Sequence, residues 1–364
     1  MISKLFQHLF KHIDAFQMTC LFFALLTSLF VLYSASGQSI DRIYAQAVNM
    51  MVAFSVLWVA ANIPPQKLER VALALYVLGV LLLVAVALFG SISHGARRWL
   101  NLGFMQIQPS ELMRIAMPMM LAWYFATRDG KPSTTNFIVA GLLLAAPVAL
   151  IMKQPDLGTS LLIASSGFYV LFLAGLSWKF LVGASVSLMA LMPVFWSMLH
   201  DYQRKRIEIL FDPTQDPLGA GYHTIQAIIA IGSGGATGKG WLNGTQTQLD
   251  FLPERTTDFI FAVFSEEFGF LGNMLLLSLF TVIIMRGLMI ASQAQSTFSR
   301  LLAGSITLNF FSYAFVNMGM VSGILPVVGV PLPLISYGGT SMVTLCLGFG
   351  ILMSIHTHKN LVAN

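Results

Sequence analysis

Ten long apolar runs alternate with short polar segments along the 364 residues of the chain. The runs cover approximately residues 16–36, 46–64, 71–90, 111–127, 136–152, 159–177, 179–199, 259–285, 301–325 and 335–356. A helix needs about 20 apolar residues to cross the hydrocarbon core of a bilayer. The pattern therefore predicts an all-α polytopic membrane protein with about ten transmembrane helices. Pro118 and Pro147 interrupt the fourth and fifth runs.

The composition supports this prediction and excludes several classes of protein. Hydrophobic residues make up 56% of the chain and charged residues only 10%, whereas soluble domains have about 25% charged residues. The two cysteines, Cys20 and Cys346, lie in apolar runs, so we expect no disulfide framework and no cysteine-based metal site. The net charge of +5 comes without a basic, aromatic-rich patch, so no nucleic-acid partner is predicted.

The distribution of Lys and Arg predicts the orientation, because short cytoplasmic loops carry an excess of both. With the N-terminus inside, the short outer loops hold only Arg42, Arg97, Arg98 and Lys153. The cytoplasmic segments then hold ten basic residues: Lys4, Lys11, Lys67, Arg70, Arg128, Lys131, Lys179, Arg286, Arg300 and Lys359. We therefore expect one transmembrane domain over residues 1–364, with cytoplasmic termini and one long extracytoplasmic loop at about 200–258.

Two charged residues near the start of the fourth run are conspicuous, because charges inside a membrane are costly. Glu111 and Arg114 are three residues apart, so on a helix they share a face and can form an ion pair. Two interpretations stay open. The pair either stabilises the bundle or forms a polar wall of a cavity.

The outer loop before this run contains Arg97, Arg98 and Trp99. Trp99 can serve as an interfacial anchor. Two adjacent arginines on the outer side run against the usual charge bias, and they indicate an anionic ligand at the membrane surface.

The long loop carries further basic residues, including Arg206 and Lys239, and a glycine-rich stretch at 232–240. The stretch lacks the spacing of a phosphate-binding P-loop. We expect its glycines to let the backbone lie close to a ligand or to other backbone. The loop ends at Asp258, which we expect in the first turn of the next helix, with Thr256 or Thr257 as its cap.

These polar segments resemble the motifs of the SEDS family of bacterial membrane glycosyltransferases (shape, elongation, division and sporulation proteins). The matching stretches are residues 95–100, 108–111, 154–159, 216–222, 230–240, 252–261 and 329–339. Residues 241–246 and 354–358 favour the elongation branch of the family over its division branch. Arg114 stands where the family usually has Lys, and Ala227 where it often has Ser.

The resemblance implies polymerisation of lipid II, the undecaprenyl-pyrophosphoryl disaccharide-peptide, into glycan strands at the cytoplasmic (inner) membrane. It also implies a complex with a class B penicillin-binding protein and other proteins of the elongation complex. The family's catalytic aspartate corresponds to Asp258, its Gln-Pro-Ser-Glu glutamate to Glu111, and the tryptophan after the paired arginines to Trp99.

The implied reaction displaces a diphosphate with inversion, which requires one base on the acceptor hydroxyl. We assign this role to Asp258. A helix N-terminus and nearby Arg255 would make Asp258 a weak base, and a divalent cation, Mg or Mn, would ease this. Arg97, Arg98, Arg206 and Lys239 are candidates for binding the diphosphate.

Two rival functions account for part of the pattern. A lipid II flippase would explain many spans with charges inside them, but a transport site belongs nearer the midplane than Asp258. A non-catalytic scaffold for the penicillin-binding protein would explain the membrane domain, but it would leave the motif at 252–261 unexplained.

Overall fold

The computed structural model describes residues 11–93, 96–101, 106–128, 130–198, 201–216, 220–249, 251–252 and 254–358, and most of them are helical. The helices are α2 (Ala15–Ala35), α3 (Ile40–Ala61), α4 (Pro65–Phe89), α5 (Pro109–Ala126), α6 (Thr134–Met152), α7 (Leu157–Leu173), α8 (Trp178–Met198), α9 (Asp201–Phe211), α10 (Ala220–Ser233), α11 (Thr245–Gln248), α12 (Ile260–Ser292), α13 (Thr297–Val321) and α14 (Gly339–Thr357). A 3-10 turn, Pro213–Gln215, lies between α9 and α10.

Each predicted apolar run coincides with one helix, from α2 to α8 and from α12 to α14. Within the described residues, seven of these helices are long and apolar enough to cross a membrane, namely α2, α3, α4, α6, α12, α13 and α14. The prolines at 118 and 147 lie inside α5 and α6 without ending them, as neighbouring helices allow in membrane proteins. The chain is a multi-pass membrane protein.

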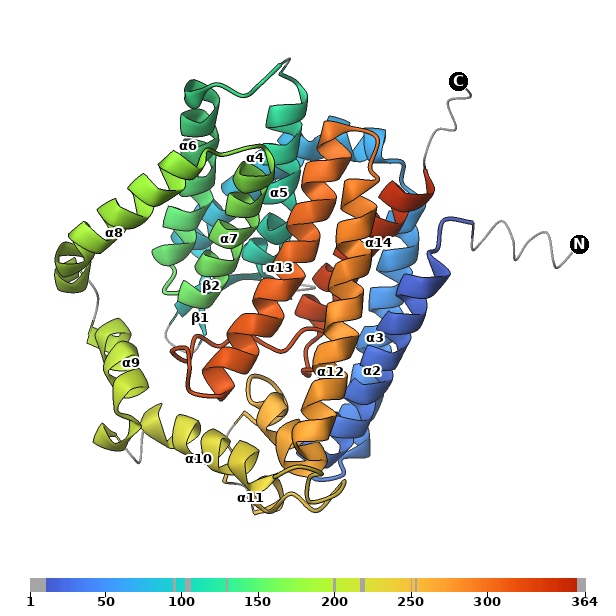
Figure 1. The fold of residues 1–364 in the computed structure, drawn as a ribbon, viewed down its shortest axis with the longest axis vertical. Coiled ribbons are helices and arrows are strands. Elements are labelled where there is room, and N and C mark those ends of the chain that lie inside the picture. The colour runs from blue at the N-terminus through green and yellow to red at the C-terminus, as the bar shows by residue number, and fades with distance from the viewer. Residues whose placement is uncertain are drawn as a thin grey trace, which may run out of the picture.

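The helices form an upright bundle in which α13 lies against α5, α7 and α12, and α14 lies against α3 (Figure 1). The central helices bury large side chains completely, including Met113, Met117 and Phe298. By contrast, α2, α3 and α4 expose large apolar side chains such as Phe22 and Leu81 on their outer faces. An outer surface of large apolar side chains is unfavourable in water and is what contact with lipid requires.

The two ends of the described chain meet at one end of the bundle. The rings of His12 and His358 stack with centroids 3.9 Å apart, and His12 Nδ1 lies 3.1 Å from the hydroxyl of Thr357. Arg286, in the last third of α12, donates to Asp14 at 2.7 Å. The first and last described residues of the chain therefore lie close together, and the cytoplasmic location of both termini stays a prediction.

Side-chain caps fix where many of the helices start. Five helices begin after a residue whose side chain accepts a hydrogen bond from a backbone N–H of the first turn. These caps are Asp14 for α2, Ser39 for α3, Ser133 for α6, Asp156 for α7 and Ser296 for α13. Such caps satisfy amide groups that have no partner within the helix.

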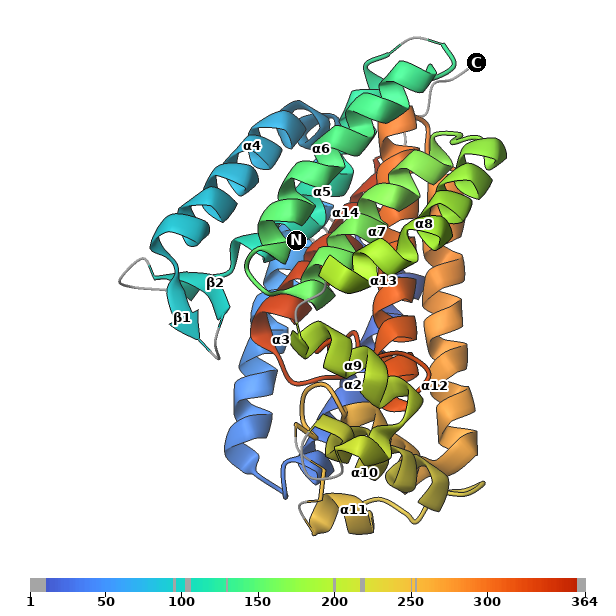
Figure 2. The same ribbon diagram turned by 90° about the vertical axis from the view of Figure 1, so that its left-hand side faces the viewer.

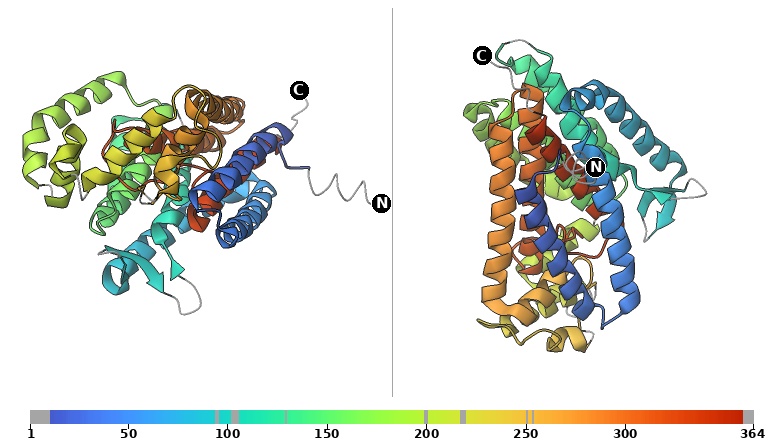
Figure 3. Two further views of the ribbon diagram at one scale, coloured as in Figure 1. Left: turned by 90° about the horizontal axis from the view of Figure 1, so that it is seen from below. Right: turned by 90° about the vertical axis from the view of Figure 1, so that its right-hand side faces the viewer.

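The predicted long loop folds into α9, α10 and α11, at the end of the bundle opposite the termini (Figures 1 and 3). The loop before α5 also differs from the all-α prediction. It forms a small antiparallel sheet of β1 (Ser91–Ser93), β2 (Ala96–Asn101) and β3 (Gln106–Ile107), which projects beside α4 (Figure 2).

Helix α12 is broken at Gly269, whose φ of 64° and ψ of −161° are not helical. The glycine-rich segment 234–240 fills the break. Lys239 N and Gly240 N donate to the carbonyl oxygens of residues 266 and 267, and the N–H groups of residues 270 and 271 donate to those of residues 235 and 236. A Cβ on Gly238 would lie 2.0 Å from the carbonyl oxygen of Glu267. The prediction that these glycines allow close approach of backbone is confirmed, and the approach is to other backbone.

Candidate functional site

Asp258 lies in a turn formed by residues 254–259, just before α12 begins at Ile260. The expectation that Asp258 belongs to the first helical turn, with Thr256 or Thr257 as its cap, is wrong. The hydroxyl of Thr257 instead donates to the backbone oxygen and the carboxylate of Glu254, at 3.2 and 2.9 Å. No side chain caps α12.

Three groups from later in the chain hold this turn. The backbone N–H of Tyr337 donates to the backbone oxygen of Thr256 at 2.9 Å. The Ser336 hydroxyl donates to that of Thr257 at 2.6 Å, and the Asn317 side-chain amide donates to that of Asp258 at 2.8 Å. Asn317 is fully buried and also donates to the backbone oxygen of Val330 at 2.7 Å. The backbone that presents Asp258 is therefore fixed by α13 and by the segment before α14.

The side chain of Asp258 lines a pocket of about 410 Å³. The other lining residues are Ile209, Leu210, His223, Thr224, Glu254, Phe259, Leu325, Pro326, Val327 and Gly329. Gly329 has a φ of +72°, and a Cβ there would lie 3.4 Å from Asp258 Oδ2. The described part of its lining thus combines two carboxylates, one imidazole and one hydroxyl with an apolar wall.

The ion pair predicted between Glu111 and Arg114 is present, with Nη1 and Oε2 2.7 Å apart. Both side chains are nearly buried, and the hydroxyl of Thr344 also donates to Glu111 Oε2, at 3.0 Å. The pair does not line the Asp258 pocket. Arg114 borders a separate small pocket that shares no lining residue with it.

Helix α13 connects this ion pair to the Asp258 turn. The guanidinium of Arg114 lies over the ring of Tyr313, 5.1 Å from its centroid. Tyr313 and Asn317 are four residues apart on α13, so they lie on the same face, and Asn317 is the residue that holds the backbone of Asp258.

Arg98 approaches Asp156, the cap of α7, with Nε and Oδ2 3.7 Å apart, and it donates to the backbone oxygen of Pro155 at 2.7 Å. Trp99 follows it in β2 and pairs with Ser91 of β1. Arg97 belongs to the same strand, but its side chain lies outside the part of the structure that is described. Neither Arg98 nor Trp99 lines the Asp258 pocket.

Lys239 forms a salt bridge with Glu266 at 2.7 Å, and it also donates to Thr245 at 2.7 Å. Glu266 is fully buried and additionally accepts from the Gln246 amide at 3.0 Å. Lys239 is therefore engaged in holding the glycine-rich segment rather than lining the pocket. Arg206, the remaining basic candidate, lies on α9, and its side chain is outside the described residues.

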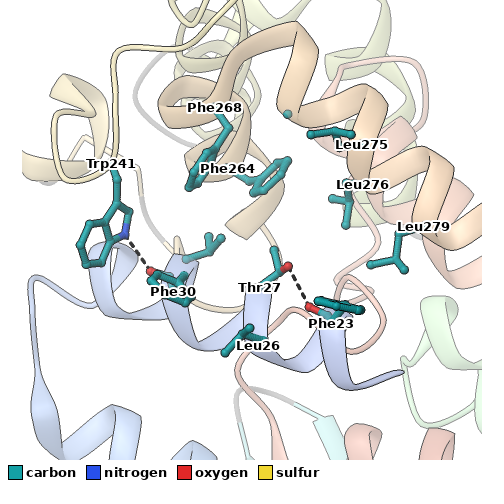
Figure 4. A pocket seen from close by; sticks show the side chains of 12 residues that line it. Phe23, Leu26, Thr27, Phe30, Trp241, Phe264, Phe268, Leu275, Leu276 and Leu279 are labelled. Carbon is teal, nitrogen blue, oxygen red and sulfur yellow. Dashed lines mark hydrogen bonds between the residues drawn. The ribbon is translucent and has the colours of Figure 1, made fainter. Parts of the chain in front are cut away.

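A larger hollow, of about 480 Å³, lies between α2 and α12 (Figure 4). Its lining is almost entirely apolar, with the Trp241 indole donating to the backbone oxygen of Phe30 at 3.0 Å. Among the described residues, it shares no lining residue with the Asp258 pocket and contains no ionisable side chain. Despite its size, it has no group that could transfer a proton.

Sequence reasoning missed His223, Thr224 and Glu254 as residues of the pocket. Glu254 lies inside the motif that carries Asp258, so its position in that motif was the available signal. His223 comes directly after the matching stretch 216–222, on α10. Among the described residues, no group of three or more His, Cys, Asp or Glu side chains is arranged to hold a metal ion.

Comparison with known proteins agrees with this arrangement. The family model described as "Cell cycle protein", which covers FtsW, RodA and SpoVE, matches residues 9–361. The peptidoglycan glycosyltransferase MrdB of Escherichia coli K12 is 52% identical over 97% of this chain and 95% of its own length. MrdB of Helicobacter pylori J99 is 38% identical over 88% of this chain and 84% of its own.

Two solved structures share the fold. One chain from a peptidoglycan synthase complex, in which polymerization and crosslinking are coordinated, has a TM-score of 0.84 and 29% identity, covering 95% of this chain and 99% of its own. The rod shape determining protein RodA of Thermus thermophilus has a TM-score of 0.71 and 27% identity, covering 94% and 96%. The chain therefore belongs to the SEDS family of cell cycle proteins, together with FtsW, RodA and SpoVE.

Proposed function

We propose that this chain, a peptidoglycan glycosyltransferase of the SEDS family, polymerises lipid II into glycan strands for cell elongation and rod shape, with Asp258 as general base. The observation that carries the proposal is the position of Asp258. It lines a pocket together with residues of α9 and α10, on a turn held by three hydrogen bonds from distant residues. If the termini are cytoplasmic, this pocket faces the outer side of the bacterial inner membrane.

In the proposed reaction, the 4-hydroxyl oxygen of the acceptor sugar attacks the anomeric carbon of the donor. The bond from that carbon to the diphosphate oxygen breaks, and its electron pair leaves with the diphosphate. The hydroxyl proton passes to the carboxylate of Asp258 and then to solvent. Because the diphosphate is a good leaving group and the transfer inverts configuration, one carboxylate suffices.

The hydrogen bonds that hold the backbone around Asp258 support this role. A general base must lie within hydrogen-bond reach of the proton that it removes, and small displacements reduce the rate steeply. Asn317, Ser336 and Tyr337 fix the backbone of the turn. We assign Glu111 and Arg114 a supporting role through Tyr313 and α13, because the pair lies outside the pocket.

A divalent cation, Mg or Mn, fits the chemistry of the pocket. Mg²⁺ is commonly held by one or two carboxylates together with phosphate oxygens of the substrate. Asp258 and Glu254 are the carboxylates that line the pocket. Such an ion would neutralise negative charge on the diphosphate.

We also propose a class B penicillin-binding protein as the partner that crosslinks the strands. The support is the likeness to a chain of a synthase complex that combines polymerization with crosslinking.

The test is polymerisation of purified lipid II in detergent by the isolated chain, comparing wild type with Asp258→Asn and Asp258→Ala. We expect both variants to lose at least 100-fold in rate, since positioned general bases contribute about 10²–10⁴-fold. Asp41→Asn, an exposed carboxylate on α3 outside the pocket, is the matched control and should retain the wild-type rate.

The same assay separates the rival functions. Detergent removes the two sides of the membrane, so a flippase would give no strands, and a scaffold would give none without its partner. Wild-type rates from Asp258→Asn would contradict the assignment of the base.

A further inference from the structure

The pocket of Asp258 contains a histidine for which the proposed reaction has assigned no role. His223 lies on α10, in the segment predicted as an outer loop, and its ring lines the pocket. The ring stacks on Phe259, the residue after Asp258, with centroids 5.8 Å apart and planes at 20°. The imidazole is thus held beside the catalytic turn by a rigid aromatic contact.

One ring nitrogen of this imidazole, Nδ1, has hydrogen-bonding capacity that the described part of the protein does not use. The Nδ1 atom is buried and has no hydrogen-bond partner in the described part of the chain. Buried polar groups in native proteins are nearly always hydrogen-bonded, and exceptions call for a functional explanation. The ring lines the pocket, so a small rotation of the imidazole about its χ angles would turn this nitrogen toward a ligand there.

The proposed reaction, rather than the charge of the lining, indicates what kind of ligand this is. Among the described lining residues there are two carboxylates, Glu254 and Asp258, and neither Lys nor Arg. His223 is the one described lining side chain that can become a cation. The reaction, however, releases a diphosphate and must stabilise negative charge on it as the glycosidic bond breaks.

The basic residues that sequence reasoning offered for this task are engaged elsewhere where their side chains are described. Lys239 is paired with Glu266 at 2.7 Å, and Arg98 lies 3.7 Å from Asp156. Neither lines the pocket. Besides the divalent cation proposed above, a protein hydrogen-bond donor to the diphosphate is therefore unassigned within the described lining, and the His223 imidazole can supply one.

We propose that His223 binds the diphosphate of the donor lipid and stabilises it as it leaves. This proposal rests on the proposed function. As the C–O bond to the diphosphate breaks, its electron pair moves onto the leaving oxygen. An imidazole N–H donates a hydrogen bond to a diphosphate oxygen without transferring its proton, because a ring nitrogen that carries hydrogen is a donor. Asp258 takes the proton of the acceptor hydroxyl, so the two residues act on opposite partners of the reaction.

The test compares the wild-type protein with His223→Gln and His223→Ala in lipid II polymerisation, and measures inhibition by added undecaprenyl diphosphate. We expect His223→Ala to raise both KM and the inhibition constant at least tenfold. Glutamine, which can donate a hydrogen bond but carries no charge, should recover part of the loss. Ile229→Ala, an exposed position on the same helix outside the pocket, is the control and should behave as wild type.

The outcomes separate this proposal from the one on which it rests. An inactive wild-type chain, or an active Asp258→Asn protein, would overturn the proposed function. An unchanged inhibition constant and an unchanged KM in the histidine variants would overturn the role of His223 alone. If His223→Ala does not fold, His223→Gln, which is close in size, carries the same comparison.

Discussion

Replacing Lys239 with methionine removes the cationic partner that the structure gives to Glu266. Glu266 is fully buried in α12, next to the break at Gly269. Its carboxylate keeps neutral donors, among them the Gln246 amide at 3.0 Å and the Thr245 hydroxyl at 3.1 Å. The substitution therefore leaves a buried negative charge with hydrogen bonds but without a counter-charge.

The expected loss of stability is about 3 kcal/mol. Breaking a buried ion pair by removing one partner costs about 3–5 kcal/mol. The side chain of Lys239 is 26% exposed, so water weakens the interaction, and the low end of the range applies. Such a loss corresponds to a decrease in Tm on the order of 5 °C.

The assay is thermal unfolding of the purified proteins in one detergent, followed by intrinsic fluorescence, for Lys239→Met, Glu266→Gln and the double variant. Glutamine keeps an acceptor oxygen and places no charge in the core. The double variant should therefore be more stable than Lys239→Met alone. Equal Tm values for Lys239→Met and wild type would refute the reasoning, and so would purely additive losses in the double variant.

Two further predictions concern backbone packing and the buried ion pair. Gly238→Ala should destabilise the protein by several kcal/mol in the same thermal assay, because its Cβ would lie 2.0 Å from the Glu267 oxygen at a φ of +80°; Gly141→Ala, with no atom within 4 Å of the new Cβ, should be neutral or stabilising. Glu111→Gln should lower both stability and polymerisation rate, because it leaves Arg114 buried without its charged partner; a variant equal to wild type in both measurements, with and without the penicillin-binding protein, would contradict this.

The membrane helices could be predicted from the sequence because their signal is local. An apolar run of sufficient length specifies a span regardless of its neighbours, and each run became one helix. The same locality explains why Glu111 and Arg114 could be paired in advance, since three residues of spacing on a helix determine their proximity.

The geometry of the site depends on contacts between distant parts of the chain. Thr256 and Thr257 have the residue type of helix caps, yet their turn is fixed by Asn317, Ser336 and Tyr337, about 60 to 80 residues later. Local propensity gives way to such tertiary contacts. Spacing alone could not have revealed them.

The roles of the charged residues between α8 and α12 could not be decided from the sequence either. Lys239 has the residue type of an anion-binding group, but it lies against Glu266, 27 residues away in sequence. His223 occupies the pocket because α10 lies against α12. A sequence shows which charges exist, and the fold decides which of them are already neutralised.

The break in α12 has a consequence for how the protein is assembled in the membrane. A helix interrupted at Gly269 leaves backbone groups without partners in its own hydrogen-bond ladder, and each such group costs several kcal/mol in hydrocarbon. Segment 234–240 supplies those partners, and it precedes α12 in the chain. During synthesis this segment therefore emerges first, and α12 can settle into its broken form only against it. We therefore expect the two to fold as one unit, so that segment 234–240 acts as a built-in assembly partner of α12 although it lies outside the Asp258 pocket.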